Sequence, residues 1–375
     1  MSVFNGCYNK NQTMFIRQEF IMQSIEIIKT TAPKEKPDDT KLGFGKYFTD
    51  HMFVMDYCPE FGWHDAKIIP FGNLTLHPAA TVLHYGAEIF EGLKAYRTPD
   101  GGVQLFRPTE NIERLNNSAD RICLPKVDPD FILEALKKFV EVEKDWVPHA
   151  EGTSLYLRPF LFGNDETLGV HTIQSAKYMV IASPVGSYYP EGINPVKIMI
   201  ETKDVRAVRG GTGYTKCGGN YAASNRAGEI AEKKGFSQVL WLDGVERKYI
   251  EEVGAMNVMF KIDGTVVTPK LTGSILPGVT RKSCIQLLKD KGIPVEERLL
   301  SVDELIEALE NGKLEEAWGC GTAAVVSPIG QLSYGDKDYI VNNFQIGEIT
   351  QYLYDTLTGI QWGKTADPHG WTVKI

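Results

Sequence analysis

Residues 184–195 read PVGSYYPEGINP and divide the chain into two parts of similar length. The stretch contains three prolines and two glycines, a composition that interrupts both helices and central strands. We interpret residues 186–195 as a linker between a smaller α/β domain at 37–185 and a larger domain at 196–375. A surface loop within one domain is the alternative, and residues 1–36 are expected to form a loose extension.

Short strands and hairpins are predicted on both sides of this linker. The turn sequence DGG at 100–102 precedes the apolar run 103–106, and residues 154–162 alternate as a strand does. An Asp-Gly pair follows the apolar run 239–242, and another divides the segment 258–267. Because Asp-Gly between apolar runs favours a tight turn, these segments predict β-hairpins.

Helices are predicted from capping residues that precede apolar patterns. Asp130 is a candidate N-cap for a helix with apolar residues at helical spacing. Two further helices are expected at about 280–291 and 302–310, and Ser301 with Glu304 fits a capping box at the start of the second. Helices and hairpins together predict the α+β class in two domains.

Composition excludes several classes of function. The 375 residues are 43% hydrophobic and 23% charged, as in an ordinary enzyme, and the net charge of -8 argues against a nucleic-acid binder. No apolar stretch approaches the ~20 residues of a membrane helix, and no secretory signal is visible. The six cysteines form neither CxxC pairs nor zinc-site spacings, so we expect no metal and a reduced, cytoplasmic protein.

The densest chemical signal is the segment RGGTGYTKCGGNYAASN at 209–225. Glycines flank Lys216 on both sides and allow the backbone to approach a bulky ligand. A lysine that is desolvated in such a place has a lowered pKa and becomes a nucleophile. The alternative is a flexible surface loop with an ordinary solvated lysine.

Ten segments in order match one enzyme family. They are FTDHM (48–52), NLTLHP (73–78), LHYGAEIFEGLKAY (83–96), LFRPTENIERL (105–115), RICLP (121–125), GTSLYLRP (152–159), YTKCGGNYA (214–222), EVGAMN (252–257), ILPGVTR (275–281) and GCGTAAVVSP (319–328). On these residues the chain resembles the branched-chain amino-acid aminotransferases of class IV, in their longer form. The resemblance implies the two-domain architecture called fold type IV, with mixed or antiparallel sheets and flanking helices.

The resemblance also implies pyridoxal 5'-phosphate as cofactor. Lys216 would hold the cofactor covalently and move the substrate proton, Tyr221 would contact the phenolic oxygen, and Glu252 would contact the ring nitrogen. The expected phosphate-binding residues are Arg114, Val279, Thr280 and Thr322. For two of these roles the residues leave alternatives: Arg114 could form a surface ion pair with Glu110 or Glu113, and Glu251 competes with Glu252 by position.

The implied reaction transfers the amino group of leucine, isoleucine or valine to 2-oxoglutarate. The expected substrate-binding residues are Phe44, Tyr85, Phe90, Tyr156, Arg158, Leu168, Val170, Thr322 and Ala323. Leu168 and Val170 would reach over from the second subunit of a homodimer, and Tyr188 of the linker would close over the site.

Other functions remain open at this stage. One alternative is a D-amino-acid aminotransferase or an aminodeoxychorismate lyase, since both share the fold. Another is a non-catalytic binding protein, which would be expected to lack one of the essential groups at Lys216, Tyr221, Glu252 and Arg114. Ala324 and Ser327 stand where some animal relatives carry a CxxC redox pair, which excludes a thiol switch there. Ala255 stands where some relatives carry threonine, so one possible link between the pocket wall and the cofactor ring is missing.

Overall fold

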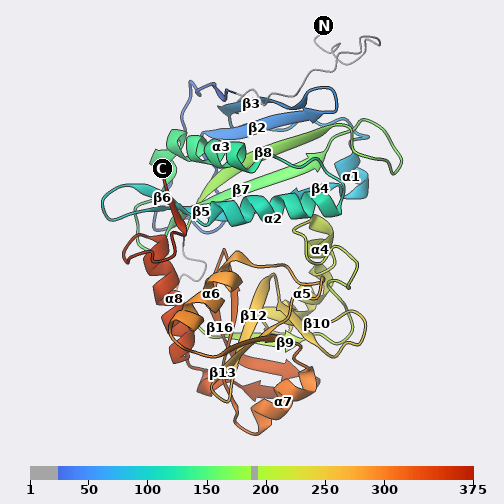
Figure 1. Cartoon of the computed structure of the whole chain (residues 1–375), viewed down its shortest axis with the longest axis vertical. Coiled ribbons are helices and arrows are strands. Elements are labelled where there is room, and N and C mark those ends of the chain that lie inside the picture. The colour runs from blue at the N-terminus through green and yellow to red at the C-terminus, as the bar shows by residue number, and fades with distance from the viewer. Residues whose placement is uncertain (1–23, 187–192) are drawn as a thin grey trace.

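Two sheets, one above the other in Figure 1, form the frame of the protein. The computed structural model describes residues 24–186 and 193–375, and the linker residue Tyr188 lies outside this description. Within the described chain each sheet has nine strands, and both contain parallel as well as antiparallel pairs. The predicted class, mixed sheets with flanking helices, is therefore confirmed.

The first sheet is built mainly from the N-terminal half. Its strand order is β1 (Glu26–Ile27), β3 (Gly62–Pro70), β2 (His51–Cys58), β8 (Ala176–Val185), β7 (Ser154–Gly163), β5 (Leu93–Arg97), β6 (Val103–Phe106) and β18 (Thr372–Lys374), and β4 (Glu88–Phe90) pairs with β7. Helices α2 (Pro108–Arg121) and α3 (Pro129–Val142) pack their apolar residues into the core of this sheet.

The second sheet curls so that six of its strands close on themselves. Its order is β11 (Ile250–Val253), β10 (Gln238–Leu242), β9 (Val196–Ile200), β16 (Val325–Tyr334), β15 (Leu314–Gly321), β12 (Met256–Ile262), β13 (Thr265–Pro269) and β14 (Val295–Arg298), and β17 (Lys337–Ile340) pairs with β16. Because β11 also pairs with β12, the strands from β11 to β12 form a closed ring. Closure leaves those strands without a free edge.

Of the remaining helices, α1 (Thr81–Tyr85) lies beside the first sheet, and the others lie around the second sheet and at its junction with the first (Figure 1). These others are α4 (Gly218–Ala222), α5 (Asn225–Lys233), α6 (Val279–Asp290), α7 (Val302–Glu310) and α8 (Glu348–Gln361). None of the helices in the described ranges is long and apolar enough to cross a membrane.

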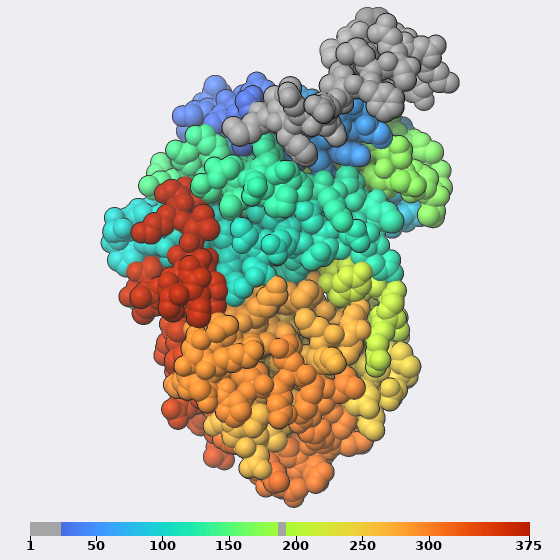
Figure 2. Space-filling model, in the orientation of Figure 1, coloured from blue at the N-terminus to red at the C-terminus, as the bar shows by residue number. Residues whose placement is uncertain are grey.

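A shared apolar core joins the two halves. Tyr96 and Phe106 of the first sheet pack with Trp318 of the second and with residues of α6 and α8. Figure 2 shows the blue-to-green half resting on the yellow-to-red half, with the C-terminal residues lying against the first. The candidate site lies between the two halves of the molecule, which this core holds together.

Several local predictions are confirmed. Strand β7 covers the expected segment 154–162, and β12 and β13 form a hairpin in which Asp263 and Gly264 both have positive φ. This backbone matches the type I′ turn that Asp-Gly favours. Strands β10 and β11 also pair, but through a longer connection in which the Asp243 carboxylate accepts four backbone N–H bonds.

Two capping predictions need correction. The N-cap of α3 is Asp128, whose carboxylate accepts from the backbone N–H of Phe131, and Pro129 takes the first helical position. Asp130 lies inside the first turn, where its charge still suits the helix dipole. At α7, Ser301 accepts from the N–H of Glu304 as expected, but the Glu304 carboxylate binds Arg298 instead of closing the capping box.

The linker separates the two sheets along the chain, except that the C-terminal strand returns to the first sheet. Strand β8 ends at Val185 and β9 begins at Val196 in the other sheet, while the domain boundaries themselves stay a prediction. The last strand returns to the first sheet, where Thr372 pairs with Phe106. Residues 26–27, expected within a loose extension, pair in parallel with β3.

Candidate active site

A cavity of about 230 Å³ lies between the two sheets and collects most of the predicted site residues. The predicted residues that line it are Phe44, Phe90, Arg114, Tyr156, Arg158, Lys216, Tyr221, Glu252, Val279, Thr280, Thr322 and Ala323. They come from β4, β7, α2, the loop before β2 and the segment 214–222 on one side. On the other side they come from β11, the start of helix α6 (Val279–Asp290) and the turn between β15 and β16. Ala255 also lines the cavity.

Lys216 is held in place by the first half of the molecule. Its backbone N–H donates to the Ser118 hydroxyl at 3.0 Å, and its carbonyl accepts from the Phe90 N–H at 2.9 Å. The amine donates to the Tyr221 hydroxyl at 2.6 Å and lies 4.8 Å from the centre of the Phe90 ring. These contacts exclude the alternative of a lysine in a flexible surface loop.

The charge of Lys216 is disfavoured by its surroundings. Burial lowers the pKa of the amine to about 8, the positive charges of Arg114 and Arg158 act in the same direction, and Glu91 opposes them. A lysine with this pKa supplies neutral amine near neutral pH, which an ordinary lysine does not.

Glu252 also lines the cavity and is held by several contacts. One oxygen of its carboxylate accepts from the Leu276 N–H at 2.9 Å and from the Asn257 amide at 3.3 Å, and the other lies 3.0 Å from Nε of Arg206. Burial raises the pKa of this carboxyl, and the Arg206 charge opposes the rise. The carboxylate is therefore buried, oriented and close to one cation.

The neighbouring Glu251 points elsewhere. Its carboxylate accepts from the Ser274 hydroxyl, and the residue is not among those that line the cavity. Both glutamates are buried, so neither is a solvated strand end. The alternation of β11 separates their side chains, as a period of two requires.

Arg114 has a partner that lies outside its own helix. Its guanidinium makes two hydrogen bonds of 2.8 Å to the Glu91 carboxylate and one of 3.1 Å to the Pro277 carbonyl. The alternative of a surface ion pair with Glu110 or Glu113 is wrong, because Arg114 is buried and pairs with Glu91, while Glu110 binds Arg107 and Lys282. Although burial acts to raise the pKa of Glu91, the Arg114 charge holds it below its usual value.

Helix α6 points its N-terminus toward the cavity near Arg114. Its N-cap is Gly278, and Val279 and Thr280 begin the helix and line the cavity. The first N–H groups of a helix and its dipole favour an anion. A side chain at Gly278 would collide with the Asn257 amide oxygen, so glycine is needed where the loop approaches β12.

The other wall of the cavity is aromatic and carries one arginine. The rings of Phe44 and Tyr156 meet edge to face at 5.0 Å, and those of Phe90 and Tyr221 lie 4.9 Å apart. The Arg158 guanidinium lies over Phe90 at 4.7 Å and donates to the Tyr156 hydroxyl at 2.9 Å. Its buried Nε has no hydrogen-bond partner among the described residues, so the group keeps a donor for a ligand.

Residues 88–332 match the family model of amino-transferase class IV. The chain belongs to this family. It is 56% identical over 353 residues to branched-chain-amino-acid aminotransferase 2 of Bacillus subtilis, an alignment that covers 94% of this chain and 97% of that protein.

Solved structures agree with the family assignment. The branched-chain amino acid aminotransferase of Escherichia coli superposes with a TM-score of 0.72 at 27% identity, over 86% of this chain and 98% of that one. A second branched-chain amino acid aminotransferase, solved with pyridoxamine 5'-phosphate, gives a TM-score of 0.72 at 26% identity, over 89% of this chain and 98% of that one.

Three predicted residues do not line the cavity of this class IV chain. Tyr85, expected to help hold the substrate carboxylate, is 44% exposed, and its hydroxyl accepts from the Gly169 N–H at 2.8 Å. Leu168 and Val170 in the same loop are 64% and 89% exposed. Tyr85 therefore lies outside the cavity of its own chain and its role stays a prediction, as do those of Leu168 and Val170, which were expected to act on a partner subunit.

Sequence reasoning missed the residues that hold the site residues in place. Glu91 binds Arg114, Arg206 and Asn257 hold Glu252, and Ser118 fixes Lys216. The only available signal was that Glu91 and Asn257 fall inside the matched segments 83–96 and 252–257. Three or more metal-binding side chains do not cluster anywhere in residues 24–186 and 193–375.

Proposed function

We propose that this protein is a branched-chain amino-acid aminotransferase that uses pyridoxal 5'-phosphate. In a reversible ping-pong cycle, leucine, isoleucine or valine gives its amino group to the enzyme and leaves as a 2-oxo acid. 2-Oxoglutarate then takes the amino group and leaves as glutamate. The observation that carries the proposal is the Lys216 amine, which lies 2.6 Å from the Tyr221 hydroxyl in a cavity that the buried Glu252 carboxylate also lines.

The residues around the cavity fit this cofactor. Lys216 would be the covalent attachment point, Tyr221 would contact the phenolic oxygen and Glu252 would contact the ring nitrogen. The groups for the phosphate are Arg114, the start of α6 at Val279 and Thr280, and Thr322. The cavity thus has a chemically suited group for each end of the cofactor. The N-terminus of α6 offers backbone N–H donors of the kind that bind phosphate in many proteins.

Pyridoxal phosphate, when bound, withdraws electrons from the substrate α-carbon and makes its proton acidic. The Lys216 amine takes that proton and later returns it, and its lowered pKa keeps this base usable near neutral pH. The Leu276 N–H and the Asn257 amide orient the Glu252 carboxylate, whose negative charge would favour a protonated ring nitrogen. Phe90 and Tyr221 restrict the access of water to the amine.

The substrate site needs an anion side and an apolar side. The backbone N–H groups of Thr322 and Ala323 suit the α-carboxylate, and Arg158 with Tyr156 suits the second carboxylate of 2-oxoglutarate. Phe44, Phe90 and Tyr221 offer apolar surface to a branched side chain.

We also infer that the active form is a homodimer in the cytoplasm. Leu168 and Val170 expose large apolar side chains on a loop whose Gly169 N–H is bound by the Tyr85 hydroxyl, and exposed apolar surface of this kind supports an interface with a second copy. The five cysteines in the described ranges are free thiols, which supports a reducing compartment.

One spectroscopic experiment tests the reaction. The purified holoenzyme should lose the visible absorbance of its bound cofactor when leucine is added, and 2-oxoglutarate should restore it. Lys216→Ala should abolish turnover and this absorbance, while Lys126→Ala, at an exposed ion pair, should change neither. Activity on D-alanine without activity on leucine would favour a D-amino-acid aminotransferase and refute the proposal.

A further inference from the structure

A buried lysine links the two sheets next to the cavity. Lys94 lies in β5 of the first sheet and is 6% exposed. Its amine donates a 2.9 Å hydrogen bond to the Ala323 carbonyl, in the turn between β15 and β16 of the second sheet. The side chain lies on the same face as Tyr156, its cross-strand neighbour, but is not among the groups that line the cavity.

The charge of Lys94 is not balanced by any acid in the described part of the chain. The amine forms no ion pair there, and burial alone lowers its pKa to about 8. Arg114, buried to the same extent, has the Glu91 carboxylate as its partner. A buried cation without a counter-ion is unfavourable unless a ligand supplies the opposite charge.

The turn that Lys94 holds carries free donors. In the described structure, neither Thr322 nor Ala323 has a partner for its backbone N–H, and both residues line the cavity. Val325, at the end of the turn, has a φ of 61°, a left-handed conformation that a β-branched residue adopts only where its surroundings enforce it. A hydrogen bond from outside the hairpin, such as that of Lys94, is one such constraint.

We propose that Lys94 is a positioning residue for the carboxylate of the substrate. Its amine fixes the Ala323 carbonyl so that the neighbouring N–H groups face the cavity, and its positive charge is balanced when a carboxylate binds to them. The inference rests on the proposed function and adds to it a residue that acts through the turn and touches neither cofactor nor substrate.

The test compares a charged with a neutral ligand on the holoenzyme. 4-Methylpentanoate has the carbon skeleton of leucine without its amine, and 4-methylpentanamide has the same shape without the charge. Lys94→Met should weaken binding of the acid by about tenfold or more, as expected when a charge-assisted contact is lost, and binding of the amide by less than about twofold. Calorimetric titration measures both, and the visible absorbance of the bound cofactor should not change.

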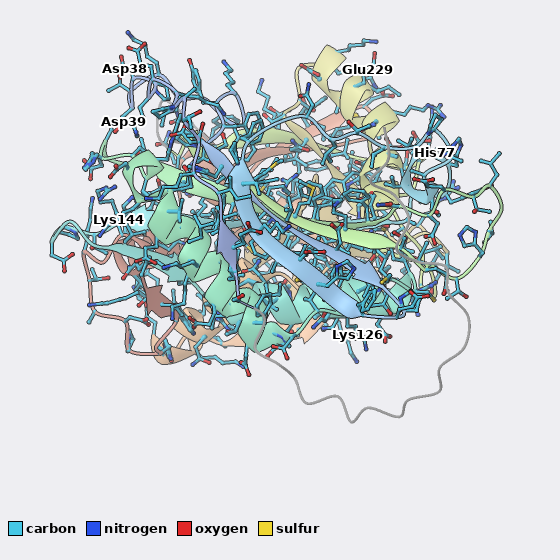
Figure 3. All side chains as sticks on the ribbon, turned by 90° about the horizontal axis from the view of Figure 1, so that it is seen from above. Asp38, Asp39, His77, Lys126, Lys144 and Glu229 are labelled. Atoms are coloured by element: carbon cyan, nitrogen blue, oxygen red, sulfur yellow. The ribbon has the colours of Figure 1, made fainter. Side chains whose placement is uncertain are left out.

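Two further variants separate charge from folding. Lys94→Arg keeps the charge and should stay within about threefold of the wild type for the acid. Lys94→Gln keeps a donor without charge and should lose affinity for the acid even if Lys94→Met does not fold. Lys126→Met is the matched control, because Lys126 is exposed at the rim of the molecule (Figure 3) and should bind both ligands as the wild type does.

Two results would overturn the inference. One is a Lys94→Met or Lys94→Gln protein that binds 4-methylpentanoate as tightly as the wild type, and the other is an equal loss for acid and amide. In kinetics, the KM for leucine and for 2-oxoglutarate should rise more than kcat falls. If the wild type transaminates leucine but the variants keep its affinities, only this inference fails. A wild type without transamination refutes the proposed function as well.

Discussion

The amine of Lys216 lies 2.6 Å from the hydroxyl of Tyr221, five residues later in the chain. Burial moves the two pKa values in opposite directions, because it disfavours the charged form of each group: it lowers that of Lys216 and raises that of Tyr221. At neutral pH the tyrosine therefore keeps its proton, while the lysine is close to losing one. The hydrogen bond therefore joins the neutral hydroxyl of Tyr221 to a lysine amine that loses its proton easily and can then act as a base.

This relationship predicts how the apoenzyme takes up pyridoxal phosphate. Only the neutral amine attacks the cofactor aldehyde, so the rate should rise with pH and level off above about 8, the pKa to which burial lowers Lys216. Stopped-flow absorbance between about pH 6 and pH 10 measures this rate. An ordinary lysine, with a pKa near 10.4, would give a rate that still rises at the upper end of this range.

The control for this pH profile is Arg158→Met. Because the Arg158 charge lowers the pKa of Lys216, removing it should move the inflection to higher pH. A rate that keeps rising to the upper end of the range in the wild type would contradict the prediction.

The buried pair of Arg114 and Glu91 predicts different effects for its two members. Arg114→Met should leave the Glu91 carboxylate buried and unpaired, at a cost of about 3–5 kcal/mol in the free energy of unfolding. It should also weaken binding of pyridoxal phosphate, since a cation is lost at the cavity. Denaturant unfolding of the apoenzyme and titration with the cofactor measure the two effects separately.

Glu91→Gln is the matched variant for the same pair. It should lose stability but keep the cofactor affinity, because the arginine remains. Wild-type cofactor affinity in Arg114→Met would show that the arginine is only a structural ion-pair partner of Glu91.

Features that are set by residues close together in the chain could be predicted from the sequence. The turn at Asp263 and Gly264 and the cap at Ser301 are set by residues within a few positions, and both were predicted. The α3 cap was misplaced by two residues because Asp128 and Asp130 are both good caps and only the position of Pro129 decides between them.

Contacts between distant residues could not be predicted in this way. Glu91, the partner of Arg114, lies 23 residues earlier in the short link between β4 and β5, and Lys94 contacts Ala323 across 229 residues. No local pattern encodes either pair, since the first depends on how α2 packs against the first sheet and the second on how the two sheets meet. The family resemblance supplied the positions of the cavity residues, but not the second layer of side chains that orients them.

Arg206 is predicted to control the charge of Glu252. Its Nε lies 3.0 Å from that carboxylate, whose pKa burial already raises. Arg206→Met should raise this pKa further, so that Glu252 takes up a proton and no longer supports positive charge on the cofactor ring. We expect kcat/KM for leucine to fall by about tenfold or more, as for the loss of a charge-assisted contact.

The fall should be accompanied by a shift in the absorbance of the bound cofactor. Glu251→Gln is the control, because that carboxylate is also buried but binds Ser274 away from the cavity. An Arg206→Met protein with unchanged absorbance and activity would show that the ion pair has no influence on the ring.

Arg158 is predicted to distinguish the two substrates of the cycle. Its guanidinium lies over Phe90, donates to Tyr156 and keeps a buried Nε without a partner among the described residues. 2-Oxoglutarate carries a second carboxylate that leucine lacks, so only the former needs this donor. Arg158→Met should raise the KM for 2-oxoglutarate by about tenfold or more and that for leucine by less than about threefold. Half-reaction rates, measured from the cofactor absorbance with each substrate alone, separate the two effects. Equal losses for both substrates would instead assign Arg158 to the α-carboxylate that the two have in common.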